Sequence, residues 1–415
     1  MSDAAAIAYN ESVSLRLTGT LDQPALERAV QALVNRHEAL RTRISATGDT
    51  QEVLPTLTMD LPLVDYSGSP GGAHSEQIAT WLAEESRRTL DLTTGPLFRV
   101  ALLKVAATEH LLVLTAHHII IDGWSMNVLL HELSALYDAA CADEVASLPL
   151  APQFSEYIAW QQATKQSSGL AAEEAYWLEQ LSGELPLLEL PFDRPRPPQK
   201  SYQGALATVR LSTQTTQALQ QLSRQQGCTL FMTLFTAYTI LLHRLCDQEE
   251  VIVGVPVTGR TMPNGMGVVG YCTNLLPIRS RCNNFTASDK QQATGDGGTF
   301  QQFLHESRRR LLDAYANQEY PFARLISQLS VPRDLSLSPV ISSTFNLTQQ
   351  PTLPSLTGLT VALGPRPTSF VDHDLSVNIV ENNGELLVDF EYSRDLFTQS
   401  AAQRIADHFT TLLTG

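Results

Sequence analysis

Two histidines and an aspartate stand close together in residues 116–125, which read AHHIIIDGWS. An imidazole exchanges protons near neutral pH, so His117 or His118 could serve as a general base or acid. The residues at 111–116 are nearly all apolar, which is typical of a strand buried on both faces. Such a strand would hold an imidazole in a fixed position next to the turn at Gly123, where the imidazole could transfer a proton.

Two plainer interpretations of this cluster compete with catalysis. A histidine beside a core strand is most often a hydrogen-bonded structural residue. Two imidazoles and a carboxylate also form a possible ligand set for a metal ion. Because adjacent side chains in a strand point to opposite faces, His117 and His118 cannot easily bind the same ion. The spacing therefore favours one inward catalytic imidazole, one structural imidazole and no metal.

Hydrophobic periodicity predicts the elements that position this cluster. Residues 13–17 alternate apolar and polar side chains like a half-buried strand, and Asp22 is placed to cap the helix that follows. Residues 97–105 and 110–116 predict a hairpin that leads directly into the cluster. Ser125 is expected to cap the next helix. The cluster thus lies between a strand end and a helix start, where backbone N–H groups are available to a reacting group.

Composition divides the chain near its middle. Residues 185–204 contain five prolines and few helix formers, as expected for a linker. Since 415 residues exceed a typical single core, we predict an N-terminal lobe at 1–184 and a C-terminal lobe at 205–415. The second lobe is expected to begin with two helices in 211–246 and a buried strand at 251–257.

Charge and cysteine usage restrict the class of protein. A formal net charge of −15 disfavours a nucleic-acid partner, which would need clustered lysine and arginine. No apolar run reaches membrane-spanning length and the start lacks a basic secretory signal, so we expect a cytoplasmic protein without a membrane partner. Five cysteines without Cys-x-x-Cys spacing argue against a disulfide framework or a zinc ribbon. The polar, glycine-containing residues 283–298 predict a mobile loop.

The pattern His-His-x-x-x-Asp-Gly at 117–123 resembles the signature of the condensation domains of nonribosomal peptide synthetases, relatives of chloramphenicol acetyltransferase and the CoA-dependent acyltransferases. Further motifs similar to those of the family follow in the family's order, so the resemblance covers about residues 8–412. They read RHEALRT at 36–42, FSEYIAW at 154–160, VGYCTN at 269–274 and on to Arg279, NQEYPF at 317–322 and RDLSLSP at 333–339.

Two departures from the family pattern stand out. The family's first motif, a helix with a Ser-x-Ala-Gln type sequence, does not precede Ala8. Asn317 replaces a usual histidine and Ala323 a usual glutamate in the sixth motif, at positions peripheral to the chemistry. With no adenylation or carrier segment in the sequence, we expect a domain excised from a larger synthetase.

The resemblance implies an α/β (α+β) fold of two acetyltransferase-like lobes, arranged as a V-shaped pseudo-dimer with a central tunnel. It implies formation of an amide (peptide) bond between an acyl or peptidyl thioester on an upstream carrier protein and the amine of an aminoacyl thioester on a downstream carrier protein. The 4′-phosphopantetheine would be supplied by the donor and acceptor carrier proteins, and the chain itself would need no cofactor. An adjacent adenylation domain is expected in the parent synthetase.

The resemblance also assigns roles within the signature. His118, the second histidine, would hold the amine in line and take its proton after attack, with His117 beside it in the catalytic pair. The backbone N–H of Gly123, with that of Trp124 or Ser125, is expected to stabilise the developing oxyanion. Glycine would permit close approach and unusual torsions at this turn.

Asp122 is expected to be structural rather than catalytic. The matching aspartate of the superfamily forms a salt bridge, and Arg36 or Arg41 is the expected partner here. Loss of either partner would leave an unpaired buried charge. Candidates for lining the substrate channel are Trp124, Ser125, Trp160, Asn274 and Arg279.

Two other functions fit the same residues. The chain could transfer an acyl group to a soluble amine or alcohol with the same His118. It could also be a catalytically silent module that docks or gates carrier proteins, in which case replacement of His118 would change nothing. An intact strand, histidine pair and turn favour catalysis, since a scaffold does not need that arrangement.

Overall fold

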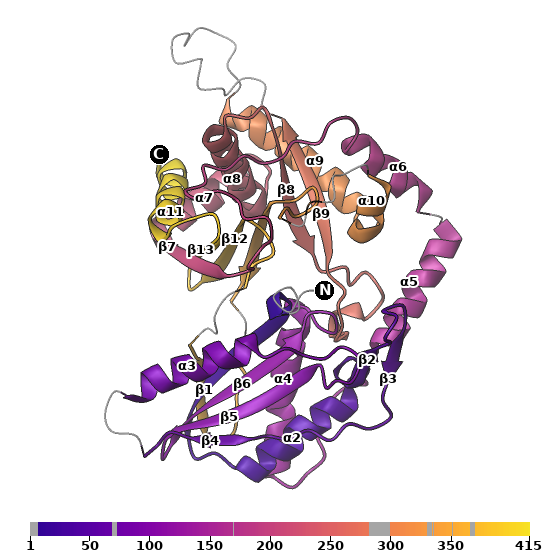
Figure 1. Ribbon diagram of the computed structural model, residues 1–415, viewed down its shortest axis with the longest axis vertical. Coiled ribbons are helices and arrows are strands. Elements are labelled where there is room, and N and C mark those ends of the chain that lie inside the picture. Colours follow the sequence, from indigo (N-terminus) through magenta and orange to yellow (C-terminus); the bar gives the residue numbers. More distant parts are fainter. Residues whose placement is uncertain are drawn as a thin grey trace. The chain divides into compact units, whose positions relative to one another are not determined.

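The computed structural model describes residues 7–415 except 69–72, 169, 282–298, 330–333, 335, 351 and 366–369 (Figure 1). The predicted loop at 283–298 therefore lies outside the described residues. The chain forms two compact units, each with its own sheet and helices, which confirms the mixed α/β class. The first comprises Met1–Ser168, Arg260–Thr273 and Pro351–Thr368, and the second Gly169–Gly259, Asn274–Gln350 and Ser369–Gly415.

These units differ from the division predicted at residues 185–204. Two segments from the C-terminal half belong to the first unit, because one adds a strand to its sheet and the other packs around the signature. The added strand is β11 (Leu359–Leu363), which pairs antiparallel with β1 (Asn10–Gly19). Local composition cannot indicate which unit such segments join, since their contacts are with residues far away in the sequence.

The sheet of the first unit has the strand order β11-β1-β6-β5-β4. Its central strand β6 (Glu109–His117) pairs antiparallel with β1 and with β5 (Phe98–Ala106), and the short β4 (Leu63–Asp65) lies at one edge. A separate pair is formed by β2 (Thr42–Ile44) and β3 (Gln51–Val53). The helices of this unit are α2 (Gln23–Arg36), α3 (Ala73–Arg87), α4 (Gly123–Cys141) and α5 (Phe154–Ser168).

Both faces of β6 are buried, as its run of apolar residues predicts. Leu112 and Leu114 pack into the cluster formed with α2 and α4, whereas Leu111 and Val113 pack into the cluster formed with α3. The strand is thus held between helices on both faces of the sheet, with His117 as its last residue and His118 directly after it. The predicted hairpin is confirmed by β5 and β6.

Helix caps agree with the sequence at one site and differ at another. Asp22 caps α2 by accepting from the Ala25 N–H, as predicted. The prediction that Ser125 caps α4 is wrong, because the cap is Asp122, whose side chain accepts from the Ser125 N–H. Both residue types favour this position, and the chain uses the one that precedes the glycine.

The second unit is built around the sheet β7-β13-β12-β10-β8-β9. The two predicted helices and the buried strand are confirmed as α7, α8 and β8. Its strands are β7 (Gly204–Leu211), β8 (Glu250–Val257), β9 (Asn274–Arg281), β10 (Ser343–Gln349), β12 (Leu375–Asn382) and β13 (Glu385–Ser393), and its helices are α6 (Ala171–Gln180), α7 (Thr213–Gln225), α8 (Leu230–Cys246), α9 (Phe300–Ala316), α10 (Phe322–Gln328) and α11 (Gln399–Thr414).

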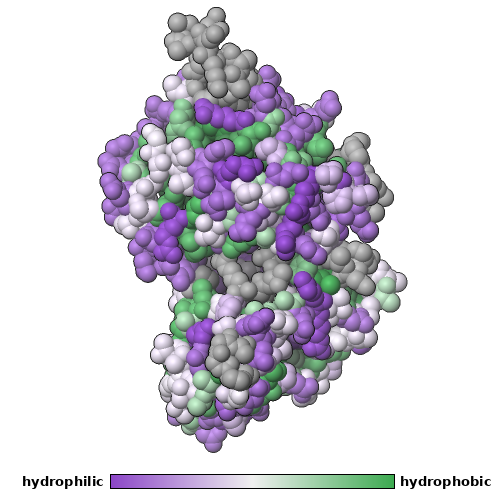
Figure 2. Space-filling view, turned by 60° about the vertical axis from the view of Figure 1, so that its left-hand side comes forward, coloured by the Kyte–Doolittle hydropathy of each residue, from purple (hydrophilic) through white to green (hydrophobic). Residues whose placement is uncertain are grey.

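Apolar side chains gather inside each unit rather than on its surface. In Figure 2, hydrophilic side chains cover much of the visible face of both units, with apolar residues scattered among them. Within the described residues, no single helix has the length and apolarity to cross a membrane, although the bent pair α7 and α8 passes that test together. The described residues also contain no group of three or more histidine, cysteine, aspartate or glutamate side chains that could hold a metal ion.

Candidate active site

The backbone around His118 is fixed by the sheet of the first unit. His117 is the last residue of β6 and pairs in register with Asn10 of β1. The His118 N–H donates to the Tyr9 carbonyl at 2.7 Å, which continues the ladder one residue beyond the strand. The Ile120 N–H then donates to the His117 carbonyl at 3.0 Å, which turns the chain after the strand. These bonds hold His118 rigidly where β6 leads into α4.

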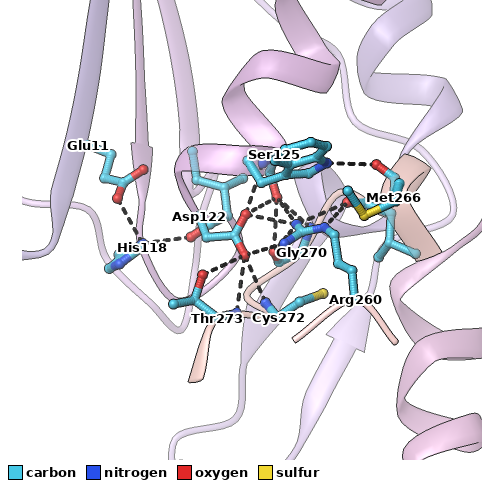
Figure 3. A network of polar contacts seen from close by, with 12 residues as sticks. Glu11, His118, Asp122, Ser125, Arg260, Met266, Gly270, Cys272 and Thr273 are labelled. Carbon is cyan, nitrogen blue, oxygen red and sulfur yellow. Dashed lines mark hydrogen bonds and ion pairs between the residues drawn. The ribbon is translucent and has the colours of Figure 1, made fainter. Parts of the chain in front are cut away.

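The contacts of the half-buried His118 ring fix its tautomer (Figure 3). Its Nδ1 lies 2.7 Å from the Ile121 carbonyl oxygen. A carbonyl oxygen can only accept, so Nδ1 carries the hydrogen and Nε2 of the neutral ring carries the lone pair. The Tyr271 ring meets the imidazole at right angles, with ring centroids 5.1 Å apart. Nε2 is therefore the atom of His118 that can accept a proton.

A carboxylate that sequence analysis did not single out approaches the same imidazole. Glu11 lies on β1, and its Oε1 is 3.0 Å from Nδ1 of His118. Partial loss of solvent around the carboxyl, 32% of whose side chain stays exposed, raises the pKa of Glu11 above its ordinary value, while the His118 ring opposes this rise and Asp122 adds to it. The predicted strand began at Val13, so Glu11 fell outside it. Extending the alternation of that strand by two residues places Glu11 on the same face as Val13, which is the sequence signal for its position.

His117 occupies a different environment from His118. It is buried and stacks on Tyr9, with ring centroids 6.0 Å apart. Its Nδ1 accepts a hydrogen bond from the Ile119 N–H at 3.0 Å, so its lone pair is already used. Burial, followed by the neighbouring His118, lowers the pKa of His117 to about 4. A ring that is neutral at physiological pH with its lone pair engaged suits a structural role.

Asp122 is the centre of a buried polar network (Figure 3). Its two oxygens accept from the Arg260 guanidinium at 2.7 and 2.8 Å, and both side chains are almost fully buried. The N–H groups of Cys272 and Thr273 also donate to Oδ2, at 3.0 and 3.2 Å. Burial alone would raise the pKa of this carboxyl, but the hydrogen bonds and charge of Arg260, helped by Ser125, lower it. Asp122 is thus a fixed carboxylate, not a proton carrier.

The prediction that Arg36 or Arg41 forms the salt bridge with Asp122 is wrong. Arg36 instead donates to both oxygens of Glu132, at 2.8 and 3.2 Å. Arg41 donates to the backbone carbonyls of Val34 and Leu54. The true partner, Arg260, is 138 residues away in sequence, and no local spacing connects the two. Arg260 reaches Asp122 because segment Arg260–Thr273 packs on the first unit despite its position in the C-terminal half.

The oxyanion donors expected at the turn are only partly available. The Ser125 N–H donates to Asp122 Oδ1 at 2.8 Å and is therefore engaged. Gly123 and Trp124 are exposed and begin α4, where N–H groups have no partner within the helix. The expectation of unusual torsions at Gly123 is wrong, since its φ is outside the left-handed region. A Cβ at Gly123 would meet no described atom within 4 Å, so glycine there leaves space open.

Two of the channel candidates attach the signature to segment Arg260–Thr273. The Trp124 indole N–H donates to the Met266 carbonyl at 2.8 Å. The Ser125 hydroxyl accepts from the Gly270 N–H at 3.0 Å and lies 2.8 Å from Asp122 Oδ1. The start of α4 is thereby held to this segment at several points, which orders the residues beside His118.

The remaining candidates lie apart from this network. Trp160 of α5 packs against a small apolar cluster of Tyr157, Val268 and Cys272 in the first unit. In the second unit, Asn274 donates to the Tyr320 carbonyl at 2.8 Å, and Arg279 pairs with Glu250 at 2.9 Å. Each has a structural partner, and lining a substrate channel stays a prediction for all three.

Comparison with known proteins gives the chain a family context. A model of the condensation domain family matches residues 1–415. The chain is 36% identical over 414 residues to part of a linear gramicidin synthase from Brevibacillus parabrevis, and the match covers 98% of this chain but only 5% of that synthase. It is 34% identical over 415 residues to tyrocidine synthase 3 of the same organism, covering 99% of this chain and 6% of that synthase. The chain thus corresponds to a small part of such relatives.

Solved structures share the fold at lower identity. The X-domain from teicoplanin biosynthesis has a TM-score of 0.85 at 24% identity, covering 99% of this chain and 92% of that one. The condensation domain of the monacolin K polyketide synthase has a TM-score of 0.81 at 20% identity, covering 98% of this chain and 92% of that one. These likenesses agree with the acetyltransferase-like fold that the motifs predict.

Proposed function

Since the chain belongs to the condensation domain family, we propose that it forms an amide bond between two carrier-bound substrates, with His118 as the proton acceptor. The donor is an acyl or peptidyl thioester on one carrier protein, and the acceptor is the amine of an aminoacyl thioester on another. The observation that carries this proposal is the tautomer of His118, whose Nδ1 donates to the Ile121 carbonyl and leaves the Nε2 lone pair to act. An enzyme with this activity is an acyltransferase.

The chemistry of the substrates explains why one base suffices. An α-amine has a pKa of about 8, so a useful fraction is neutral near pH 7 and attacks the thioester carbon without prior activation. The nitrogen of the resulting tetrahedral intermediate is strongly acidic. Nε2 of His118 takes its proton, which prevents expulsion of the amine. The carbon–sulfur bond then breaks, and the leaving thiolate, whose thiol has a pKa of about 8.5, takes up the proton that Nε2 of His118 releases, which restores the neutral ring.

The start of α4 supplies the electrostatic part of the reaction. The thioester oxygen becomes negative in the intermediate and needs hydrogen-bond donors. The N–H groups of Gly123 and Trp124 lie at the positive end of a helix that begins beside His118. Asp122 cannot offset this effect much, because its charge is paired with Arg260. We assign the oxyanion to these two N–H groups.

The family context supports the expected partners. The relatives found in Brevibacillus parabrevis are synthases far longer than this chain. Donor and acceptor carrier proteins with 4′-phosphopantetheine arms, an adjacent adenylation domain and a cytoplasmic location belong to the same proposal. The two-lobed chain would receive one arm for each substrate.

Intact-protein mass spectrometry tests the reaction directly. One carrier domain in its phosphopantetheine form is loaded with an acyl group and a second with an amino acid, over a panel of both groups. The proposal predicts that the acyl mass moves from the first carrier to the second when the protein is added. The same amino acid free in solution is the comparison, because equal reaction with the free amine would instead identify an acyltransferase to soluble amines. Absence of transfer over the whole panel would contradict amide formation.

A further inference from the structure

We propose that Glu11 is a positioning residue that acts through His118, holding the ring and stabilising the imidazolium formed when the amine's proton arrives. This inference rests on the proposed function, since it concerns the same proton transfer. Its experiment is therefore arranged so that the two can fail separately.

The register of the sheet places Glu11 beside the imidazole. Glu11 pairs with Ala116, and the His118 N–H continues the same ladder to Tyr9. Side chains two residues apart on a strand lie on the same face. Ala116 and His118 therefore share a face, and Glu11 opposite Ala116 shares it too. The 3.0 Å contact between Glu11 Oε1 and His118 Nδ1 follows from this register.

Two oxygens lie near Nδ1 of His118: the Ile121 carbonyl accepts its hydrogen bond, and the Glu11 carboxylate makes an ion-pair contact. The Ile121 carbonyl at 2.7 Å is enough to set the tautomer of the neutral ring. What the carboxylate adds is negative charge, which matters once Nε2 has taken a proton and the ring is positive. A carboxylate behind a histidine orients the ring and stabilises its protonated form, as in other acyl-transfer sites. Glu11 is therefore expected to act during the reaction more than in the resting enzyme.

The charges around the pair support this assignment. Asp122 is the other acid that influences Glu11, and it is held by Arg260 at 2.7 and 2.8 Å. The negative charge of Asp122 is thus compensated by its own partner. The ion-pair contact of Glu11, in turn, is with His118. The carboxylate of Glu11 is the counter-charge in direct contact with the imidazole.

The first variant is Glu11→Gln, which keeps the size of the side chain and removes its charge. Glu109→Gln is the matched control, because Glu109 lies on the same strand pair, has a similar exposed fraction (28% against 32%) and pairs with Arg16 away from His118. With loaded carriers as substrates, kcat is expected to fall about tenfold in Glu11→Gln while KM for the acceptor changes less than about twofold. Glu109→Gln is expected to keep both constants. Glu11→Asp, which restores the charge, should recover part of the loss.

A double variant separates positioning from a structural role. In a His118→Ala background, Glu11→Gln is expected to cause no further loss, because the residue through which it acts is gone. An equal loss with and without His118 would overturn the proposal and identify Glu11 as structural, as would a thermal midpoint that falls in parallel with the rate. Wild-type kcat in Glu11→Gln alongside a slow His118→Ala enzyme would overturn the role of Glu11 and leave the proposed function intact. Wild-type kcat in His118→Ala would instead overturn the role of His118 as the proton acceptor in the proposed function.

Discussion

Asp122 and Arg260 are joined by two hydrogen bonds, at 2.7 and 2.8 Å, between side chains that are almost fully buried. The pair connects the residue that caps α4 to a segment from the C-terminal half of the chain. The same carboxylate accepts from backbone N–H groups of that segment. The ordering of the turn beside His118 therefore depends on a contact between residues far apart in the sequence.

Removal of Asp122 is expected to damage folding before it damages chemistry. In Asp122→Ala the Arg260 guanidinium is left buried and unpaired, so the free energy of unfolding should fall by about 3–5 kcal/mol. Urea unfolding followed by circular dichroism measures this loss. Arg16→Ala is the control, because Arg16 is 44% exposed and its pair with Glu109 should be worth about 1 kcal/mol or less. A soluble Asp122→Ala protein of wild-type stability and no activity would contradict the structural role.

Gly123 allows structure and chemistry to be separated. Gly123→Ala should fold with near wild-type stability, since the added Cβ meets no described atom within 4 Å and the backbone is not left-handed. It should nevertheless lower kcat at least about tenfold, because the methyl group occupies the open space through which the thioester oxygen reaches the N–H groups. Thermal unfolding and carrier-to-carrier rates measure the two effects. Unchanged kcat would exclude this turn as the oxyanion site.

His117 should make stability depend on pH in a defined range. The unfolded ring takes up a proton near pH 6.5 and the folded ring only near 4, so between these values the unfolded chain binds more protons. The contribution of neutral His117 to the free energy of unfolding is therefore complete above pH 6.5. It is lost as the pH drops toward 4, by up to about 3 kcal/mol. His117→Asn lacks this titration. Urea unfolding of both proteins from about pH 7 to about pH 4.5 should give converging stabilities, whereas parallel curves would show that His117 is not buried in its neutral form.

The elements around the site could be predicted from sequence because their signals are local. The apolar run at 111–116 and its hairpin partner fix β5 and β6, and Asp22 marks the start of α2. Each of these three elements is indicated by residues that lie close together in the sequence. The position of His118 directly after β6 follows from the same pattern.

The partners of the site could not be predicted in the same way. Arg260 reaches Asp122 only because a distant segment folds back onto the first unit. Arg36 and Arg41 lie in a family motif, yet their side chains bind Glu132 and backbone carbonyls. Glu11 lay just before the recognised strand pattern, so its contact with His118 required the register of β1 against β6. These are tertiary relationships that periodicity does not encode.

The rate of amide formation with His118→Ala tests the central claim most directly. Carrier domains loaded with a donor acyl group and an acceptor amino acid are mixed with wild-type or variant protein, and single-turnover transfer is followed by rapid quench and mass spectrometry. Since a general base contributes about 10²–10⁴-fold, the variant is predicted to be slower by at least about 100-fold at unchanged stability. Transfer at the wild-type rate would contradict the assignment of His118 as the proton acceptor.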